Sequence, residues 1–96
     1  MSISNTEIAS ILLDIASRLK LKKENAFKIR AYENAADYIR DWPSSVEEIA
    51  IAGRLREVPG VGEAIDKKIT ELVKTGKLEF YEKLKMETDP LLKNRQ

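Results

Sequence analysis

The amino-acid sequence predicts an all-α fold, a small bundle of four to five short helices. In several segments apolar residues recur three and four positions apart, as they do along one face of a helix. Proline and glycine stand between these segments, where they would end one helix before the next begins. No segment shows the alternation or the β-branched richness of a strand. At 96 residues with 43% hydrophobic content the chain can bury one core, so we expect a single domain over residues 1–96, ordered from about 5 to 86.

The first helix is predicted from about Asn5 to Leu21. Ser4 and Glu7 stand three residues apart, which is the spacing of a capping box at a helix start. The apolar residues that follow form one continuous stripe: Ile8, Ile11, Leu12, Ile15 and Leu19. Such a stripe is typical of a helix face that packs against a core, and we assign it no chemistry.

A second helix is predicted to begin after Asn25, a favourable N-cap residue, and to end near Asp41, because Pro43 cannot continue it. Its expected core face consists of Phe27, Ala31, Ala35, Ala36 and Ile39. Trp42 is expected to cover the core at the helix end, in preference to stacking on a base.

A short third helix is predicted next. Ser44 and Glu47 have capping-box spacing, and Gly53 would stop the helix. Residues 54–58 then form one more turn.

Two further helices follow. One is expected to run to Thr75, with Gly76 just past its C-terminal end. The last is expected to begin near Leu78 and to end at Thr88-Asp89-Pro90, which leaves a flexible tail over residues 91–96.

Between the third and fourth helices lies the stretch Val58-Pro59-Gly60-Val61-Gly62. Pro59 cannot continue a helix, and Gly60 and Gly62 permit backbone angles and close approaches that side chains forbid. The amides after Gly62 would point outward from a helix start, where they attract anions. Lys67 and Lys68 follow one turn later. We interpret the stretch as a clamp for a phosphate backbone; a mere tight turn is the alternative.

The charge distribution is almost balanced. Seventeen basic against sixteen acidic residues leave a net charge of +1, which does not by itself indicate nucleic acid. The segment from Arg18 to Arg30 is locally basic, because Glu24 is its single acidic residue. Its six basic residues are Arg18, Lys20, Lys22, Lys23, Lys28 and Arg30. It is a candidate basic patch, and a solvated helix end and loop is the competing interpretation.

The composition excludes several classes of site. The chain has no cysteine and no histidine, which excludes disulfides, thiol nucleophiles, Cys/His zinc sites and histidine acid-base catalysis. We expect no required cofactor. The N-terminal segment shows no signal peptide and no segment is a membrane span, so we expect a cytoplasmic protein.

The hairpin and its flanks, residues 54–76, resemble the helix-hairpin-helix motif of proteins that bind DNA without sequence preference. Over residues 5 to 86 the chain also resembles the N-terminal domain of family X DNA polymerases of bacterial and archaeal type. The segments that carry this resemblance are Phe27-Lys28-Ile29-Arg30-Ala31-Tyr32-Glu33-Asn34-Ala35-Ala36, Trp42-Pro43, Pro59-Gly60-Val61-Gly62 and Thr75-Gly76-Lys77-Leu78.

The resemblance implies a domain that binds the 5′-phosphate side of gapped DNA and, in eukaryotic repair members, removes a 5′-deoxyribose phosphate through a lysine Schiff base. It implies that Lys68 is the Schiff-base lysine. With the hairpin, it gives a DNA-binding set of Lys28, Arg30, Tyr32, Arg56, Gly60, Val61, Gly62, Lys67 and Lys68. Three positions depart from the family pattern: Ala64 and Phe27 replace a lysine and a histidine, and Asp66 replaces a small residue. We expect a weaker affinity for phosphate as a result.

The resemblance also implies that the backbone carbonyls of Arg56, Val58 and Val61 hold a monovalent cation, Na⁺ or K⁺, against DNA. The chain contains no nucleotidyl-transfer domain with its aspartate triad, so we expect no polymerase activity from it alone. It could be a stand-alone relative or a fragment that acts within a larger repair protein or complex.

Three functions remain open from the sequence. The first is binding of gapped, nicked or single-stranded DNA through the phosphate backbone, in DNA repair. The second is a deoxyribose-phosphate or abasic-site lyase in which Lys68 is the nucleophile. Glu71, three residues further on the same helix face, would stabilise the Lys68 ammonium and oppose its activation. The third is a protein-interaction bundle in which the hairpin is purely structural.

Overall fold

In the computed structural model, which describes residues 2–93, the chain folds into helices joined by short turns, with no strand in that range. The elements are α1 (Asn5–Leu21), α2 (Ala26–Arg40), α3 (Val46–Ile51), a 3₁₀ turn at Leu55–Glu57, α4 (Glu63–Thr75) and α5 (Glu79–Lys93). The predicted all-α fold class is confirmed.

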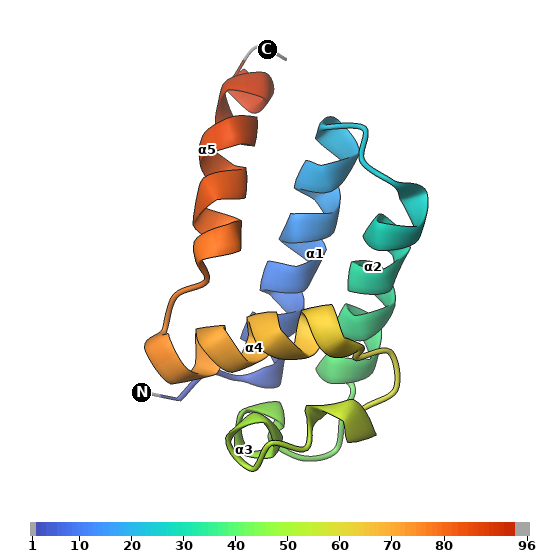
Figure 1. The fold of residues 1–96 in the computed structure, drawn as a ribbon, viewed down its shortest axis with the longest axis vertical. Helices are drawn as coiled ribbons and strands as arrows, with labels where there is room; N and C mark the ends of the chain where they lie inside the picture. The colour runs from blue at the N-terminus through green and yellow to red at the C-terminus, as the bar shows by residue number, and fades with distance from the viewer. Residues whose placement is uncertain (1, 94–96) are drawn as a thin grey trace.

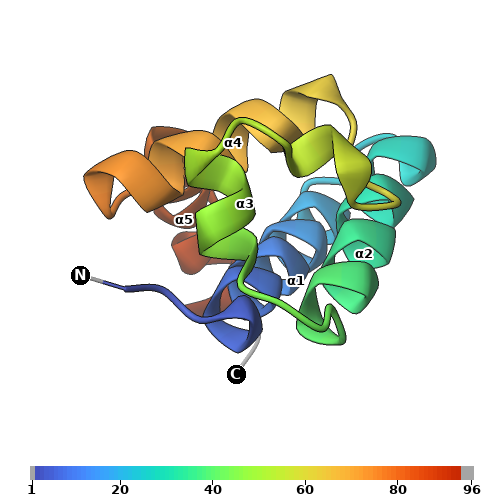
Figure 2. The same ribbon diagram turned by 90° about the horizontal axis from the view of Figure 1, so that it is seen from below.

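The helices form a bundle crossed by the hairpin segment. α1 and α2 run antiparallel side by side, and α5 lies along the other side of α1 (Figure 1). α4 crosses this layer, with α3 packed beneath it (Figure 1). Seen from below, the loop between the 3₁₀ turn and α4 lies beside α2 (Figure 2). The hairpin is therefore supported by the bundle and does not project from it.

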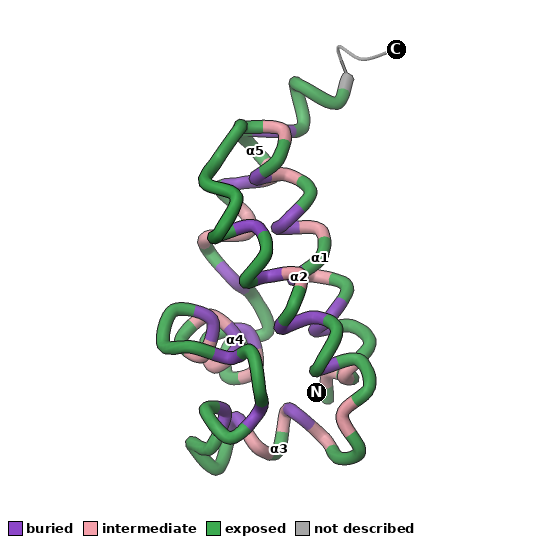
Figure 3. Tube along the Cα trace, turned by 90° about the vertical axis from the view of Figure 1, so that its right-hand side faces the viewer, coloured by how far each residue is buried: buried purple, intermediate pink, exposed green. Residues whose placement is uncertain are grey.

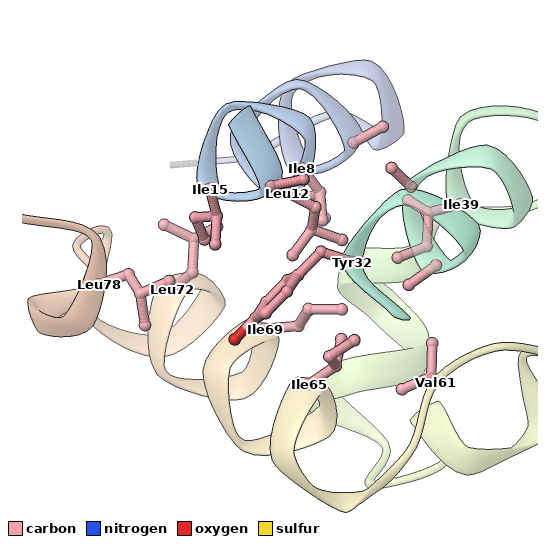
Figure 4. Close-up of a cluster of buried hydrophobic side chains, with 14 of the residues drawn as sticks. Ile8, Leu12, Ile15, Tyr32, Ile39, Val61, Ile65, Ile69, Leu72 and Leu78 are labelled. Atoms are coloured by element: carbon pink, nitrogen blue, oxygen red, sulfur yellow. The ribbon is translucent and has the colours of Figure 1, made fainter. Parts of the chain in front are cut away.

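One core joins the bundle to the hairpin. Buried positions recur along α1, α2 and α4 and alternate with exposed ones (Figure 3). Side chains from these helices meet in the centre with Val61 of the hairpin loop and Leu78 of the loop before α5. Those labelled are Ile8, Leu12, Ile15, Tyr32, Ile39, Val61, Ile65, Ile69, Leu72 and Leu78 (Figure 4). Because α4 buries its apolar face here, its exposed face has a fixed orientation relative to α2.

The helix starts confirm two predicted caps and correct a third. Ser4 and Glu7 form the full capping box of α1, and the Asn25 side chain accepts the Phe27 amide at 2.7 Å at the start of α2. α3 is capped by Ser45, whose Oγ accepts the Glu48 amide at 3.2 Å, and not by Ser44 as predicted.

The reason lies in α1, because Asn5 links the two segments. Its amide group donates to the Ser44 carbonyl at 2.8 Å, and its side-chain oxygen accepts the Val46 amide at the same distance. Glu47, expected in the capping box, accepts the Ile3 amide at 3.1 Å. These tertiary contacts move the helix start by one residue.

The core face of α2 differs from the prediction at its N-terminal end. Phe27 is 81% exposed and Ala31 is exposed, whereas Ile29 and Tyr32 are buried. Ala35, Ala36 and Ile39 are buried as expected. The buried stripe is rotated, so Ile29 and Tyr32 enter the core in place of Phe27 and Ala31. This pair removes more apolar area from water, because isoleucine is larger than alanine and the two aromatic rings are of similar size. Trp42 is half-buried and packs against the core, as predicted.

α5 continues through Pro90 to Lys93, so the predicted end at Thr88-Asp89-Pro90 is wrong. Thr88 is fully buried, and its hydroxyl donates to the Leu84 carbonyl at 2.7 Å. Arg18 of α1 donates to the Thr88 hydroxyl at 2.9 Å and pairs with Asp89. These contacts stabilise this part of α5, where Pro90 has no backbone N–H and one helical hydrogen bond is therefore missing. Of the predicted flexible tail, residues 91–93 are helical and residues 94–96 lie outside the described residues.

None of the helices described within residues 2–93 is long and apolar enough to cross a membrane.

Candidate nucleic-acid interface

The hairpin is a tight turn anchored by buried side chains on both sides. Leu55, Val58 and Val61 are each at most 6% exposed. The Val58 amide donates to the Leu55 carbonyl at 3.0 Å, and the Val61 amide donates to the Val58 carbonyl at 3.1 Å. The backbone between the 3₁₀ turn and α4 is therefore fixed before any ligand binds.

The two hairpin glycines have different roles. Gly60 has a φ of +86°, and a Cβ there would lie 3.2 Å from the Tyr38 ring and 3.5 Å from the Ala35 backbone. Gly62 has a φ of −93°, which any residue adopts, and a Cβ there would meet nothing within 4 Å. Gly60 thus packs the hairpin onto α2, whereas Gly62 leaves an open edge. The expectation of a special backbone angle holds only for Gly60.

The open edge exposes unpaired donors at the start of α4. Gly62 is the N-cap and has no side chain to cap the helix. The backbone ladder begins with the Asp66 amide, which donates to the Gly62 carbonyl at 2.9 Å. The amides of residues 62–64 have no acceptor among residues 2–93. Such groups at the positive end of a 13-residue helix favour an anion.

The charges around this helix start are nearly balanced. Arg56 Nε lies 3.2 Å from Asp66 Oδ2, and Arg56 Nη2 lies 3.9 Å from Glu63 Oε1. Lys67 Nζ lies 3.5 Å from Glu63 Oε2. Thr70 also donates to Asp66 at 3.2 Å. Asp66 is therefore satisfied within the protein, and Arg56 and Lys67 are each partly neutralised by a carboxylate.

Lys68 lies in a different environment, between α2 and α5. Its Nζ is 4.6 Å from the centre of the Phe80 ring, and Phe80 is stacked on Tyr32 with 6.4 Å between ring centres. Burial lowers the pKa of Lys68, the nearby Lys28 ammonium lowers it further, and Glu71 opposes both. Lys28 is therefore near enough to Lys68 for the two ammonium groups to repel each other.

Phe80 is a site residue that sequence reasoning missed. It stands in an apolar run with Leu78 and Tyr81, which predicts only core packing. Its contact with Lys68 depends on the orientation of α5 relative to α4, which no local sequence pattern predicts.

Two predicted binding residues are mainly structural. Tyr32 is 4% exposed, and its side chain reaches from α2 across the core toward α4 (Figure 4). Burial raises the pKa of Tyr32 to about 12, so its hydroxyl stays protonated near neutral pH. Val61 is buried, and its amide is occupied within the turn.

The candidate basic patch between Arg18 and Arg30 is smaller than its composition indicates. Arg18 pairs with Asp14 and Asp89, Lys20 with Glu33 at 2.9 Å, and Lys22 with Glu87 at 2.9 Å. Within residues 2–93, the members of this patch that have no ion pair are Lys23, Lys28 and Arg30.

The carbonyls implied as cation ligands are chemically suitable. The Val58 carbonyl accepts the Val61 amide at 3.1 Å and keeps one lone pair. The carbonyls of Arg56 and Val61 accept no backbone amide outside the helices within residues 2–93. Backbone carbonyls are ligands that hard cations prefer. Among the described residues, no group of three or more His, Cys, Asp or Glu side chains could hold a metal ion.

A comparison with protein-family models agrees with this geometry. A model described as a helix-hairpin-helix domain matches residues 3–78. The match extends from before α1 to the residue before α5, so it includes α1 to α4 as well as the hairpin.

Substitutions at the two glycines should change the free energy of unfolding in opposite directions. Gly60→Ala places a Cβ on a left-handed backbone and should lower the free energy of unfolding by about 1–2 kcal/mol. Gly62→Ser adds a favoured N-cap side chain in open space and should raise it by a few tenths of a kcal/mol. Urea unfolding of both variants checks this. Equal losses at the two positions would contradict the assigned roles.

Proposed function

Because this chain belongs to the helix-hairpin-helix domain family, whose domains generally bind nucleic acid, we propose that it binds DNA through the phosphate backbone without sequence preference. One observation carries the proposal: the unpaired amides of residues 62–64 stand at the start of the helix that carries Lys68, and Lys28 is near enough to Lys68 to lower its pKa. Backbone amides and ammonium groups bind phosphate oxygens and do not read bases.

The pair Lys28 and Lys68 favours a terminal phosphate. A 5′-phosphate monoester carries a charge of about −1.5 to −2 near pH 7. A phosphodiester within a strand carries only −1, so two ammonium groups close together select the monoester. This supports gapped or nicked DNA with a 5′-phosphate as the preferred ligand, and thereby a role in DNA repair, within or beside a larger repair protein.

The proposed affinity for DNA depends on few positive side chains. Arg56 and Lys67 already pair with carboxylates, whereas Lys28, Arg30 and Lys68 form no ion pair among the described residues. With about three phosphate contacts, the logarithm of the association constant should fall with a slope of roughly −3 against the logarithm of salt concentration. A monovalent cation held by the carbonyls of Arg56, Val58 and Val61 would supply one further positive charge at the hairpin.

A lyase is the second candidate, favoured by the lowered pKa of Lys68. Only the neutral amine can attack the aldehyde carbon of an opened abasic deoxyribose, and it forms an imine with loss of water. Removal of a C2′ proton then expels the 3′-phosphate by β-elimination. Burial and Lys28 raise the neutral fraction of Lys68 near pH 7, and Glu71 lowers it.

The DNA proposal predicts a preference for a phosphorylated gap. A one-nucleotide-gapped duplex should bind roughly tenfold more tightly with a 5′-phosphate than without one, since about 1.4 kcal/mol corresponds to tenfold. Lys68→Gln should abolish this preference. Fluorescence anisotropy at two salt concentrations measures both quantities.

Lys74→Gln is the matched control for this experiment. It removes the same charge from the same helix, but Lys74 lines a hollow with Ile3 and Glu7, away from Lys28. It should leave the preference intact. Salt-independent binding, or equal effects of the two variants, would contradict the proposal.

The lyase proposal predicts a borohydride-trapped adduct on a 5′-deoxyribose-phosphate substrate that Lys68→Ala abolishes. Lys28→Gln should raise the pKa of Lys68, because it removes one of the two causes that lower it. The rising limb of the pH profile for trapping at saturating substrate should therefore move to higher pH. An absence of adduct with the wild type at every pH would dispose of the lyase and leave DNA binding intact.

A further inference from the structure

A surface pocket lies at the C-terminal end of α2, and its Tyr38 adjoins Gly60 of the hairpin loop. Its volume is about 630 Å³, and its lining consists of Asn34, Asp37, Tyr38, Asp41, Trp42 and Pro43. Lys28 and Lys68 are not among these residues, so the pocket is separate from the proposed phosphate site.

The walls of this pocket are fixed by contacts beneath them. The Trp42 amide donates to the Ile39 carbonyl at 3.2 Å, and the Trp42 carbonyl accepts from the Asn5 side chain at 3.3 Å. Trp42 packs partly against the core, and the Tyr38 ring adjoins Gly60. Tyr38 nevertheless remains 49% exposed. Two aromatic side chains are thus held in place while part of their surface stays available.

Three features of the pocket favour a cation. Asp37 and Asp41 both line it and are exposed. The C-terminal end of a 15-residue helix adds a partial negative charge, and aromatic faces attract cations. Arg40 bridges the two carboxylates, with 3.2 Å to Asp37 and 3.6 Å to Asp41. Since two carboxylates face one guanidinium, one negative charge remains.

We propose that this pocket binds an arginine side chain from a basic segment of a partner protein. A guanidinium group is planar, stacks on aromatic rings and forms paired hydrogen bonds with carboxylates. Arg40 already shows that a guanidinium can reach both aspartates. A DNA phosphate is repelled by the same charge, so a basic protein segment, and not nucleic acid, fits the site.

Intrinsic fluorescence reports on this site, because Trp42 is the only tryptophan of the chain. The probe is a capped Gly-Arg-Arg-Gly peptide, and its citrulline analogue, which keeps the shape but lacks the charge, is the control. The arginine peptide should give a saturable change in Trp42 emission. Asp37→Asn with Asp41→Asn should weaken its binding roughly five- to tenfold, as expected for the loss of exposed ion pairs.

Further variants separate the pocket from the rest of the surface. Tyr38→Ala should weaken binding of the arginine peptide, Tyr38→Phe should retain it, and Lys68→Gln should leave it unchanged. Thermal unfolding checks that each variant folds. Equal binding of the citrulline peptide, an unchanged affinity in the double aspartate variant, or a signal that depends on protein concentration without peptide would each overturn the proposal. The last result would indicate a second copy of the chain as the occupant.

Discussion

The structure depends on the burial of the hairpin in the core of the bundle. Leu55, Val58 and Val61 are buried with the side chains of α1 and α2, and Gly60 places the turn directly against the α2 backbone. A short turn alone would be mobile, because the conformational entropy of its residues is large compared with one or two hydrogen bonds. Here the bundle holds the turn, so the amides after Gly62 face outward in a fixed orientation. The proposed anion site is therefore preorganised by packing.

The second determinant is the internal pairing of charges. Arg18 joins α1 to α5, Lys20 joins α1 to α2, and Arg56 joins the 3₁₀ turn to α4. Each pair holds elements together and also removes a cation from the surface that DNA could contact. Lys28 and Lys68 are different, because the Lys28 ammonium lies near enough to Lys68 to lower its pKa, and Lys68 stands over the Phe80 ring. A positive site of small extent fits a chain whose net charge is only +1.

Local patterns predicted the fold class, the bounds of α1, α2 and the end of α4, and the position of the hairpin, because caps and breakers act within a few residues. They failed where a contact between residues far apart in the sequence fixed the end of a helix. Asn5 shifts the start of α3, and Arg18 supports α5 through Pro90. At the site, the choice of Lys28 and Lys68 came from the family resemblance and not from a local pattern. The neutralisation of Arg56 by Asp66 and the stacking of Phe80 on Tyr32 join residues far apart in the chain, which no spacing rule covers.

The central claim is that DNA phosphates meet the start of α4 and the ammonium groups of Lys28 and Lys68. The most direct measurement is a ¹⁵N–¹H correlation spectrum of the protein titrated with 5′-phosphorylated gapped DNA, with the lysine ammonium groups observed in parallel. The account predicts the largest shifts at the amides of Gly62, Glu63 and Ala64 and at the Nζ groups of Lys28 and Lys68. Shifts confined to other surfaces, such as the exposed side of α5, with these groups unmoved, would contradict it.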